Sequence, residues 1–345
     1  MRKSMNCWKK ILCMGMICFA ADSYAQDLHF SQFFEAPLLR NPALAGIFTG
    51  DVRVQGIYRD QWNSFTNAYR SGSLSGEYKM PVGKGNDFIT GAMQLLFDRA
   101  GTAGLTTTHL LPAFNYHKSL SDEKVMYLAV GFMGGLVQKR IDRSKITTNN
   151  QYDGAAFNPS LGDGETLLNA SYNYLDAGFG GSFNTSFGTD EKNSLFVGAG
   201  FHHMHRPANS FYRTSAALHP KYVFSAGVKF AIDDYTSFTL QADQSVQGGF
   251  NETIGGALYS FGVGGDPDNP DYTLHAGAFL RWKDALIPVL KIDYKPLAIG
   301  LSYDVNVSQL KTASQGRGGF ELSVSYIGFL NRSNSSKDKI LCPRF

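Results

Sequence analysis

The sequence predicts an all-β fold: a transmembrane antiparallel β-barrel of about 14 strands with an N-terminal plug segment. Three observations predict it: a strict alternation of apolar and polar residues near the C-terminal end, an N-terminal export signal, and many aromatic residues. The alternation is clearest in residues 298–307, where Leu301 and Tyr303 alternate with Ser302 and Asp304. Successive side chains of a strand point to opposite faces, so this strand has one apolar and one polar face, as a barrel between lipid and water requires.

The first 25 residues have the features of a cleaved secretory signal peptide. A basic start that includes Arg2 and Lys3 precedes the apolar stretch 11–21, and Ala25 ends a small-residue cleavage motif. The apolar stretch is shorter than the roughly 20 residues that a membrane-spanning helix needs. We therefore expect export from the cytoplasm, with a mature chain that begins at Gln26.

The composition of the mature chain excludes some classes of protein. Removal of the signal takes away four basic residues and Asp22, which leaves 28 basic and 28 acidic residues of the original 32 and 29, so nothing points to nucleic acid. Cys342 is the one cysteine of residues 26–345, so the mature fold has no internal disulfide. A chain of this length is large for one soluble core but normal for a barrel, whose strands add sideways.

Repeated segments between residues 52 and 329 carry strand patterns, and most are close to the ~10 residues of a tilted spanning strand. Their ranges are 52–62, 70–80, 87–98, 105–118, 124–138, 175–187, 194–203, 219–231, 235–247, 252–261, 272–282, 288–295, 298–307 and 319–329. Residues 52–329 therefore form the predicted barrel, and residues 330–345 form a predicted periplasmic tail.

The connections between these segments fall into a short set and a long set. The short ones include 81–86, 119–123, 233–234 and 295–296, whereas 139–174 and 204–218 are long. Outer-membrane barrels have short periplasmic turns and long outer loops, and an upward first strand puts the two sets on opposite sides. Two connections fit this rule poorly: 262–271 is long for a periplasmic turn, and 283–286 is short for an outer loop.

Residues 26–51 precede the first predicted strand and contain the sequence Asn41-Pro42-Ala43. An asparagine before proline is kept away from helical angles, so these three residues form a firm turn. A similar Asn-Pro-Ala occurs in the N-terminal hatch of long-chain fatty-acid channels. We expect residues 26–51 to fold into the lumen as a plug, because an open barrel of this width would leave an aqueous passage. A periplasmic lead-in is the alternative.

Charged residues of both signs share the inward parity of the last strands. Lys291, Asp293, Asp304 and Glu321 lie on three successive predicted strands, and Arg281 lies on the adjoining one. Neighbouring strands bring such charges within reach of one another. We expect a lumenal brace that holds barrel and plug together. A selectivity lining is the alternative, although a filter more often has rings of one sign.

Other reactive groups give no catalytic or metal site. His202, His203 and His205 cluster at a strand end, but alternation places His202 on the opposite face from the other two, and no carboxylate is near in sequence. A polar rim is the expected role. The sequence has no nucleophile elbow, P-loop or zinc-binding helix, so we expect no enzyme, cofactor or metal.

Motifs at both ends of the mature chain resemble those of a known family. They are QDLHFSQFF at 26–34, NPALAG at 41–46, YRDQW at 58–62, FLRWKDALIP at 279–288, GLSYDVN at 300–306, GGFELS at 318–323 and CPRF at 342–345. As a set they resemble the PorP/SprF family of Bacteroidetes outer-membrane proteins, which is associated with type IX secretion and gliding motility. The resemblance covers most of the mature chain and is weakest across residues 139–174.

The resemblance implies an outer-membrane barrel without enzymatic activity. One branch of the family works with periplasmic parts of the secretion machinery, and another serves a large secreted surface protein, often an adhesin. The expected partners are therefore outer-membrane lipid, type IX machinery proteins and a large secreted surface protein. A passive or lipid-type channel similar to the fatty-acid transporters is the alternative function.

The tail after residue 329 is basic and ends in Cys342, Pro343, Arg344 and Phe345. One interpretation is a solvated extension without fixed structure. The other is a periplasmic peptide that binds a partner through its basic residues and its terminal phenylalanine, and the family resemblance gives it the same weight as the first.

Overall fold

The computed structural model describes residues 27–62, 69–83, 85–165, 169–188, 192–212, 216–267, 270–308, 314–331 and 335. The predicted signal peptide and the tail residues Cys342, Pro343, Arg344 and Phe345 lie outside these ranges. None of the helices in the described ranges combines the length and the hydropathy needed to cross a bilayer.

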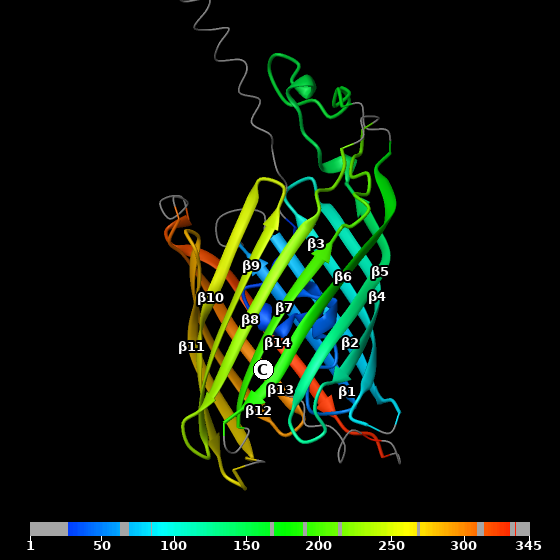
Figure 1. The fold of residues 1–345 in the computed structure, drawn as a ribbon. Coiled ribbons are helices and arrows are strands. Elements are labelled where there is room, and N and C mark those ends of the chain that lie inside the picture. The colour runs from blue at the N-terminus through cyan, green and yellow to red at the C-terminus, as the bar shows by residue number, and fades with distance from the viewer. Residues whose placement is uncertain are drawn as a thin grey trace, which may run out of the picture.

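The described residues form one closed antiparallel barrel of fourteen strands, in which each strand pairs with its neighbours in sequence and β1 pairs with β14 (Figure 1). The strands are β1 (Val52–Gln61), β2 (Tyr69–Pro81), β3 (Phe88–Ala100), β4 (Leu105–Ser119), β5 (Met126–Arg140), β6 (Ser171–Phe187), β7 (Asn193–His202), β8 (Lys221–Ala231), β9 (Thr236–Gln247), β10 (Phe250–Val263), β11 (Tyr272–Arg281), β12 (Ala285–Tyr294), β13 (Leu297–Asn306) and β14 (Arg317–Gly328). Each corresponds to one predicted segment, which confirms the predicted fold class.

Side chains alternate between the two faces of the barrel wall as the sequence pattern requires. In β13 the outward Ile299, Leu301 and Tyr303 are 41–46% exposed, whereas the inward Ser302 and Asp304 are at most 4% exposed. The same contrast between apolar outward and polar inward side chains recurs around the barrel. The outside therefore has an apolar band, and the inside is polar.

The long and short connections lie at opposite ends of the barrel, as expected. The described parts of the connections 141–170 and 203–220 rise above one end, which we call the long-loop end (Figure 1, top), and the short turns lie at the other end. The two connections whose lengths fitted the rule poorly still lie at the expected ends. Successive connections between antiparallel strands alternate between the two ends of the barrel, so β10 and β11 are joined at the short-turn end and β11 and β12 at the long-loop end.

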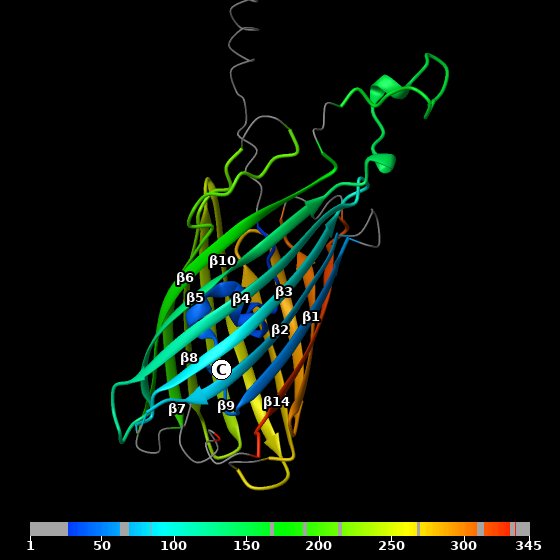
Figure 2. The ribbon, with the colours of Figure 1, turned by 90° about the vertical axis from the view of Figure 1, so that its right-hand side faces the viewer.

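Residues 27–51 lie inside the barrel (Figures 1 and 2, blue), and we call them the lumenal segment. The segment contains three short helices: η1 (Phe33–Glu35), α2 (Pro37–Arg40) and η2 (Pro42–Leu44). Its apolar side chains, among them Phe33 and Leu38, are buried against inward residues of the wall. Two further short helices, η3 (Arg143–Lys145) and η4 (Asn149–Gln151), lie in the long connection after β5.

Candidate functional site

The predicted turn Asn41-Pro42-Ala43 is bonded to the inner wall of the barrel. The Asn41 side-chain oxygen accepts a hydrogen bond from the Ala43 N–H at 2.8 Å and so caps η2, in which proline takes a first-turn position that needs no N–H. The Asn41 amide also donates to the Gly181 carbonyl at 2.9 Å. Asn115 donates to the Pro42 carbonyl at 3.0 Å, so the turn contacts both β4 and β6.

Glycines in the wall make room for this turn. A Cβ atom on Gly131 of β5 would lie 2.5 Å from the carbonyl carbon of Pro42, and one on Gly200 of β7 would lie 2.6 Å from the Arg40 carbonyl oxygen. Such contacts are impossible without movement of the backbone. The absence of a side chain at these positions therefore lets the main chain of the lumenal segment approach the main chain of the wall.

The five charged residues predicted as a brace all line the lumen, but they form two groups. In the first, Asp304 lies 3.3 Å from Arg281 and 2.9 Å from Arg59, and Arg59 lies 3.3 Å from Glu321. In the second, Lys291 lies 3.6 Å from Asp293. Arg59 of β1 was not among the predicted residues, although it shares their inward parity and links Asp304 to Glu321.

Both groups also contact the lumenal segment. The Glu321 carboxylate accepts the backbone N–H groups of Ser31 at 2.6 Å and Gln32 at 2.8 Å, and Arg281 donates to the Ser31 hydroxyl. Lys291 lies 2.7 Å from the Glu35 carboxylate. Hydrogen bonds of this charged kind are stronger than neutral ones, so each group joins the wall to the segment.

Two buried ion pairs escaped the sequence analysis. Arg40 of the lumenal segment binds both carboxylate oxygens of Asp243 on β9, with Nε 2.6 Å from Oδ2. Arg53 of β1 lies 2.6 Å from Glu77 of β2, directly opposite in register. The second pair could have been found from the sequence, because Arg53 and Glu77 share the inward parity of two neighbouring strands. No periodic pattern assigned a partner to Arg40, because the lumenal segment is irregular.

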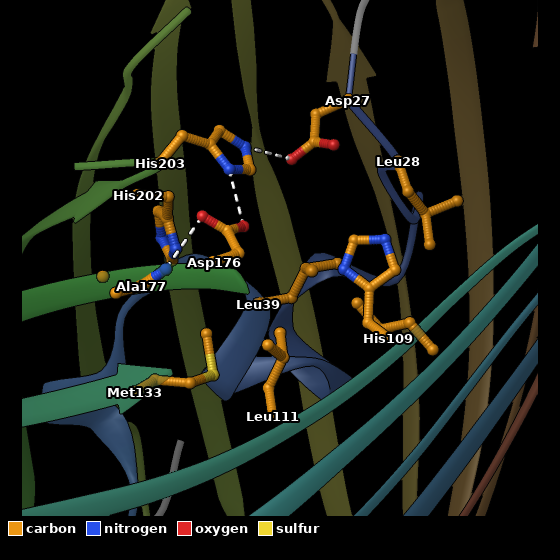
Figure 3. A pocket seen from close by; sticks show the side chains of 12 residues that line it. Asp27, Leu28, Leu39, His109, Leu111, Met133, Asp176, Ala177, His202 and His203 are labelled. Atoms are coloured by element: carbon orange, nitrogen blue, oxygen red, sulfur yellow. Dashed lines mark hydrogen bonds and ion pairs between the residues drawn. The ribbon is translucent and has the colours of Figure 1, made fainter. Parts of the chain in front are cut away.

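His203 joins the beginning of the lumenal segment to the wall (Figure 3). Its Nδ1 lies 2.7 Å from Asp176 of β6, and its Nε2 lies 3.2 Å from Asp27. Lys221 of β8 lies 3.5 Å from the same Asp27 carboxylate. Burial lowers the pKa of His203, but the charges of Asp27 and Asp176 outweigh this effect and raise it to about 9.

The expected polar-rim position of His203 is wrong, and the backbone explains why. β7 ends at His202, and His203 has a positive φ of 56°. Strand alternation therefore stops between the two residues, and both side chains are buried inside the barrel. The carboxylates that meet His203 are distant in sequence. Among the described residues, no group of three or more histidine, cysteine or acidic side chains is arranged to hold a metal ion.

A large cavity opens above the lumenal segment at the long-loop end, and we call it the vestibule. Its volume is about 890 Å³. Asp27, Leu28 and His29 of the lumenal segment contribute to its floor. Wall residues around it include Arg59, Trp62, Tyr69, Asp98, His109, Lys139, Tyr174, Phe250, Asn251, Glu252, Arg281, Trp282, Lys283 and Asp284.

Residues 22–326 match a family described as the type IX secretion system membrane protein PorP/SprF. This chain belongs to the PorP/SprF family. The match covers most of the chain and confirms the resemblance seen in its motifs. A search of curated proteins found no match.

Two solved structures are among those to which this PorP/SprF protein is similar. The toluene transporter TbuX of Ralstonia pickettii is 10% identical, with a TM-score of 0.46, and the match covers 85% of this chain and 92% of that one. A FadL homologue of Pseudomonas aeruginosa is 12% identical, with a TM-score of 0.48 and coverage of 83% and 92%.

Proposed function

We propose that this PorP/SprF protein is an outer-membrane component of the type IX secretion and gliding machinery. It engages a large secreted surface protein, adhesin-like in kind, at the long-loop end and periplasmic machinery proteins at the short-turn end. The observation that carries the proposal, together with family membership, is the lumenal segment. It is bonded to strands all around the barrel, so the surfaces free for partners are the vestibule, the outer loops and the short-turn end.

Outer-membrane residence is supported by the predicted signal peptide and by the apolar band on the barrel wall. Lipid is the partner that such a band requires. The loops 139–174 and 204–218 then face the cell surface, where a secreted protein is met. The two loops contact each other, since the Tyr212 hydroxyl donates to the Glu165 carboxylate at 2.8 Å.

In this proposal residues 26–51 act as the plug. The turn Asn41, Pro42 and Ala43 fixes one side of the plug, and the charges of Arg281, Lys291, Asp293, Asp304 and Glu321 brace the other. The mixed signs of these charges and their contacts with residues 31–35 favour a brace over a selectivity lining. An ion filter would more often present one sign of charge to a water-filled path.

The tail is proposed to dock on a periplasmic machinery protein through Cys342, Pro343, Arg344, Phe345 and its basic residues. The described part of the tail begins at the short-turn end, where the Leu330 N–H donates to Asp51 at 2.9 Å. Deletion of residues 331–345 should remove periplasmic proteins from the co-purified set while the barrel still folds. An unchanged set of partners would contradict the docking role.

The proposed function as a whole is tested by affinity purification from native outer membranes, followed by mass spectrometry. A secretion partner should co-purify with machinery proteins and with one large secreted protein. The alternative, a passive or lipid-type channel, has one favourable observation in the size of the vestibule. A channel should conduct ions or take up ligand as the purified protein, without any co-purified surface protein.

A further inference from the structure

The vestibule is a pocket with its floor inside the barrel. Its volume of about 890 Å³ lies in the upper range for ligand-binding pockets. The two cavities beside its floor measure about 30 and 50 Å³, enough for single waters. Neither of them extends the vestibule as a wide path into the lumenal segment.

Basic side chains line this space. Arg59 and Arg281 line it but are only 2% and 3% exposed, and wall carboxylates pair with them: Asp304 with both, Glu321 with Arg59, and Glu252 and Asp284 with Arg281. Lys139 also lines it, and no described residue forms a hydrogen bond or ion pair with its ammonium group; Asp27 and Asp98 are its charged neighbours. An ammonium group without a hydrogen-bond partner is costly, so Lys139 favours a ligand that brings hydrogen-bond acceptors into the pocket.

The charge of the lining is balanced. Asp27, Asp98, Glu252 and Asp284 are matched in number by Arg59, Lys139, Arg281 and Lys283. The pocket therefore does not select a ligand by net charge. Its aromatic side chains instead offer flat apolar contacts with a polar edge. Trp62, Tyr69, Tyr174, Phe250 and Trp282 supply them.

The floor already shows how this lumen binds polypeptide. Arg59 donates to the backbone carbonyl of His29 at 3.0 Å, and the Asp27 N–H donates to the Gln247 side chain at 3.2 Å. Residues 27–30 belong to no helix or strand, so their main-chain groups are free to bond with side chains of the wall. The lumen thus recognises the main chain of an irregular peptide by side-chain donors and acceptors.

An aromatic path continues from the vestibule towards the outer loops. The rings of Tyr174 and Tyr172 on β6 are stacked with centroids 6.2 Å apart, and Phe211 of the second outer loop meets Tyr172 edge-on at 4.8 Å. The binding surface is therefore longer than the cavity. A polymer can use this length, whereas a small molecule cannot.

We propose that the vestibule binds an extended segment of the secreted partner, which enters from the long-loop end as a chain end or a narrow hairpin. This inference rests on the proposed function. The ammonium group of Lys139 donates to main-chain carbonyls of the entering segment, as Arg59 donates to that of His29. The aromatic side chains pack against its side chains.

Site-specific photo-crosslinking in living cells tests this placement. The probe is p-benzoylphenylalanine, which replaces Tyr174 in the vestibule in one variant and the outward Tyr303 of β13 in a matched control. After irradiation, adducts are purified through the barrel and mapped by mass spectrometry. We expect a polypeptide adduct at position 174, mapped to one segment of one secreted protein, and no such adduct at position 303. Adding Trp282→Ala or Lys139→Ala should reduce it by about tenfold, as for central interface residues.

The outcomes separate this inference from the proposed function. If a secreted protein co-purifies but position 174 gives no polypeptide adduct, the vestibule placement is wrong and the proposed function stands. An adduct with carbohydrate or lipid at position 174 would also overturn the placement. If neither a co-purified secreted protein nor an adduct is found, both fail.

Discussion

His203 shows how a single residue ties the beginning of the lumenal segment to the wall. Burial raises the pKa of Asp27, but Lys221 and His203 outweigh it and hold that pKa well below its usual value, so Asp27 is ionised. The pKa of His203 is raised to about 9 from an unfolded value of about 6.5. Its stabilising charge is therefore fully present below about pH 6.5 and is lost as the pH rises through 9.

The variant His203→Gln should lose this contribution. Removing one partner of a buried charge group costs about 3 kcal/mol, so the folded band should melt at a lower temperature in gel-shift assays. The difference from the wild type should be large at pH 7 and small at pH 10. Lys145→Gln, which breaks an exposed ion pair, is the control and should change little. An equal difference at both pH values would contradict the charged role of His203.

The contribution of the buried ion pair Arg40–Asp243 to stability can be tested in the same way. Both side chains are less than 9% exposed, so Arg40→Met leaves an uncompensated buried carboxylate and should cost about 3–5 kcal/mol. The double variant Arg40→Met with Asp243→Leu removes both charges and should recover much of this loss. Urea unfolding of the three proteins measures the coupling. Additive losses would show that the two side chains act independently.

At the scale of the element, the glycines that face the Asn-Pro-Ala turn are testable one by one. Gly131→Ala should force Pro42 away from β5 and cost about 1–3 kcal/mol, as overpacking does. Gly76→Ala on β2 is the matched control, because a Cβ there meets nothing within 4 Å. Limited proteolysis of residues 27–51 and thermal melting report the effect. Equal behaviour of the two variants would refute the tight approach of the turn.

The strands were predictable because one face of a barrel wall meets lipid and the other meets the polar lumen, whereas the contacts that residues 27–51 make inside the lumen were not. The segment predicted at 288–295 begins earlier, as β12, because its inward Ala285, Ile287 and Val289 are apolar and pack near Phe33 of the lumenal segment. Alternation vanishes where the wall meets an apolar residue of the lumenal segment instead of water. The partners of Arg40 and His203 depend on an irregular segment and a left-handed residue, and no periodicity encodes either.

At the scale of the whole molecule, the lumenal segment fastens opposite sides of the barrel to one another. His203 and Asp243 hold it from one side, Glu321 and Lys291 from the other. Barrels of eight strands are filled by side chains, and those of 16 to 18 strands leave a channel. A barrel of fourteen strands is therefore wide enough to conduct if the segment is absent, and its closure depends on these anchors together.

Planar-bilayer recordings of the purified protein decide this point. The wild type should show no stable conductance, whereas a variant with residues 30–50 replaced by a glycine–serine linker should open steady pores. A gel-shift assay confirms that the variant is a folded barrel. Should it fail to fold, the combined variant Arg40→Met, Glu321→Gln, which keeps the segment but removes one anchor to β9 and one to β14, should give brief openings instead. Steady conductance of the wild type would contradict a fixed plug and favour the channel, because the anchors would then coexist with an open path.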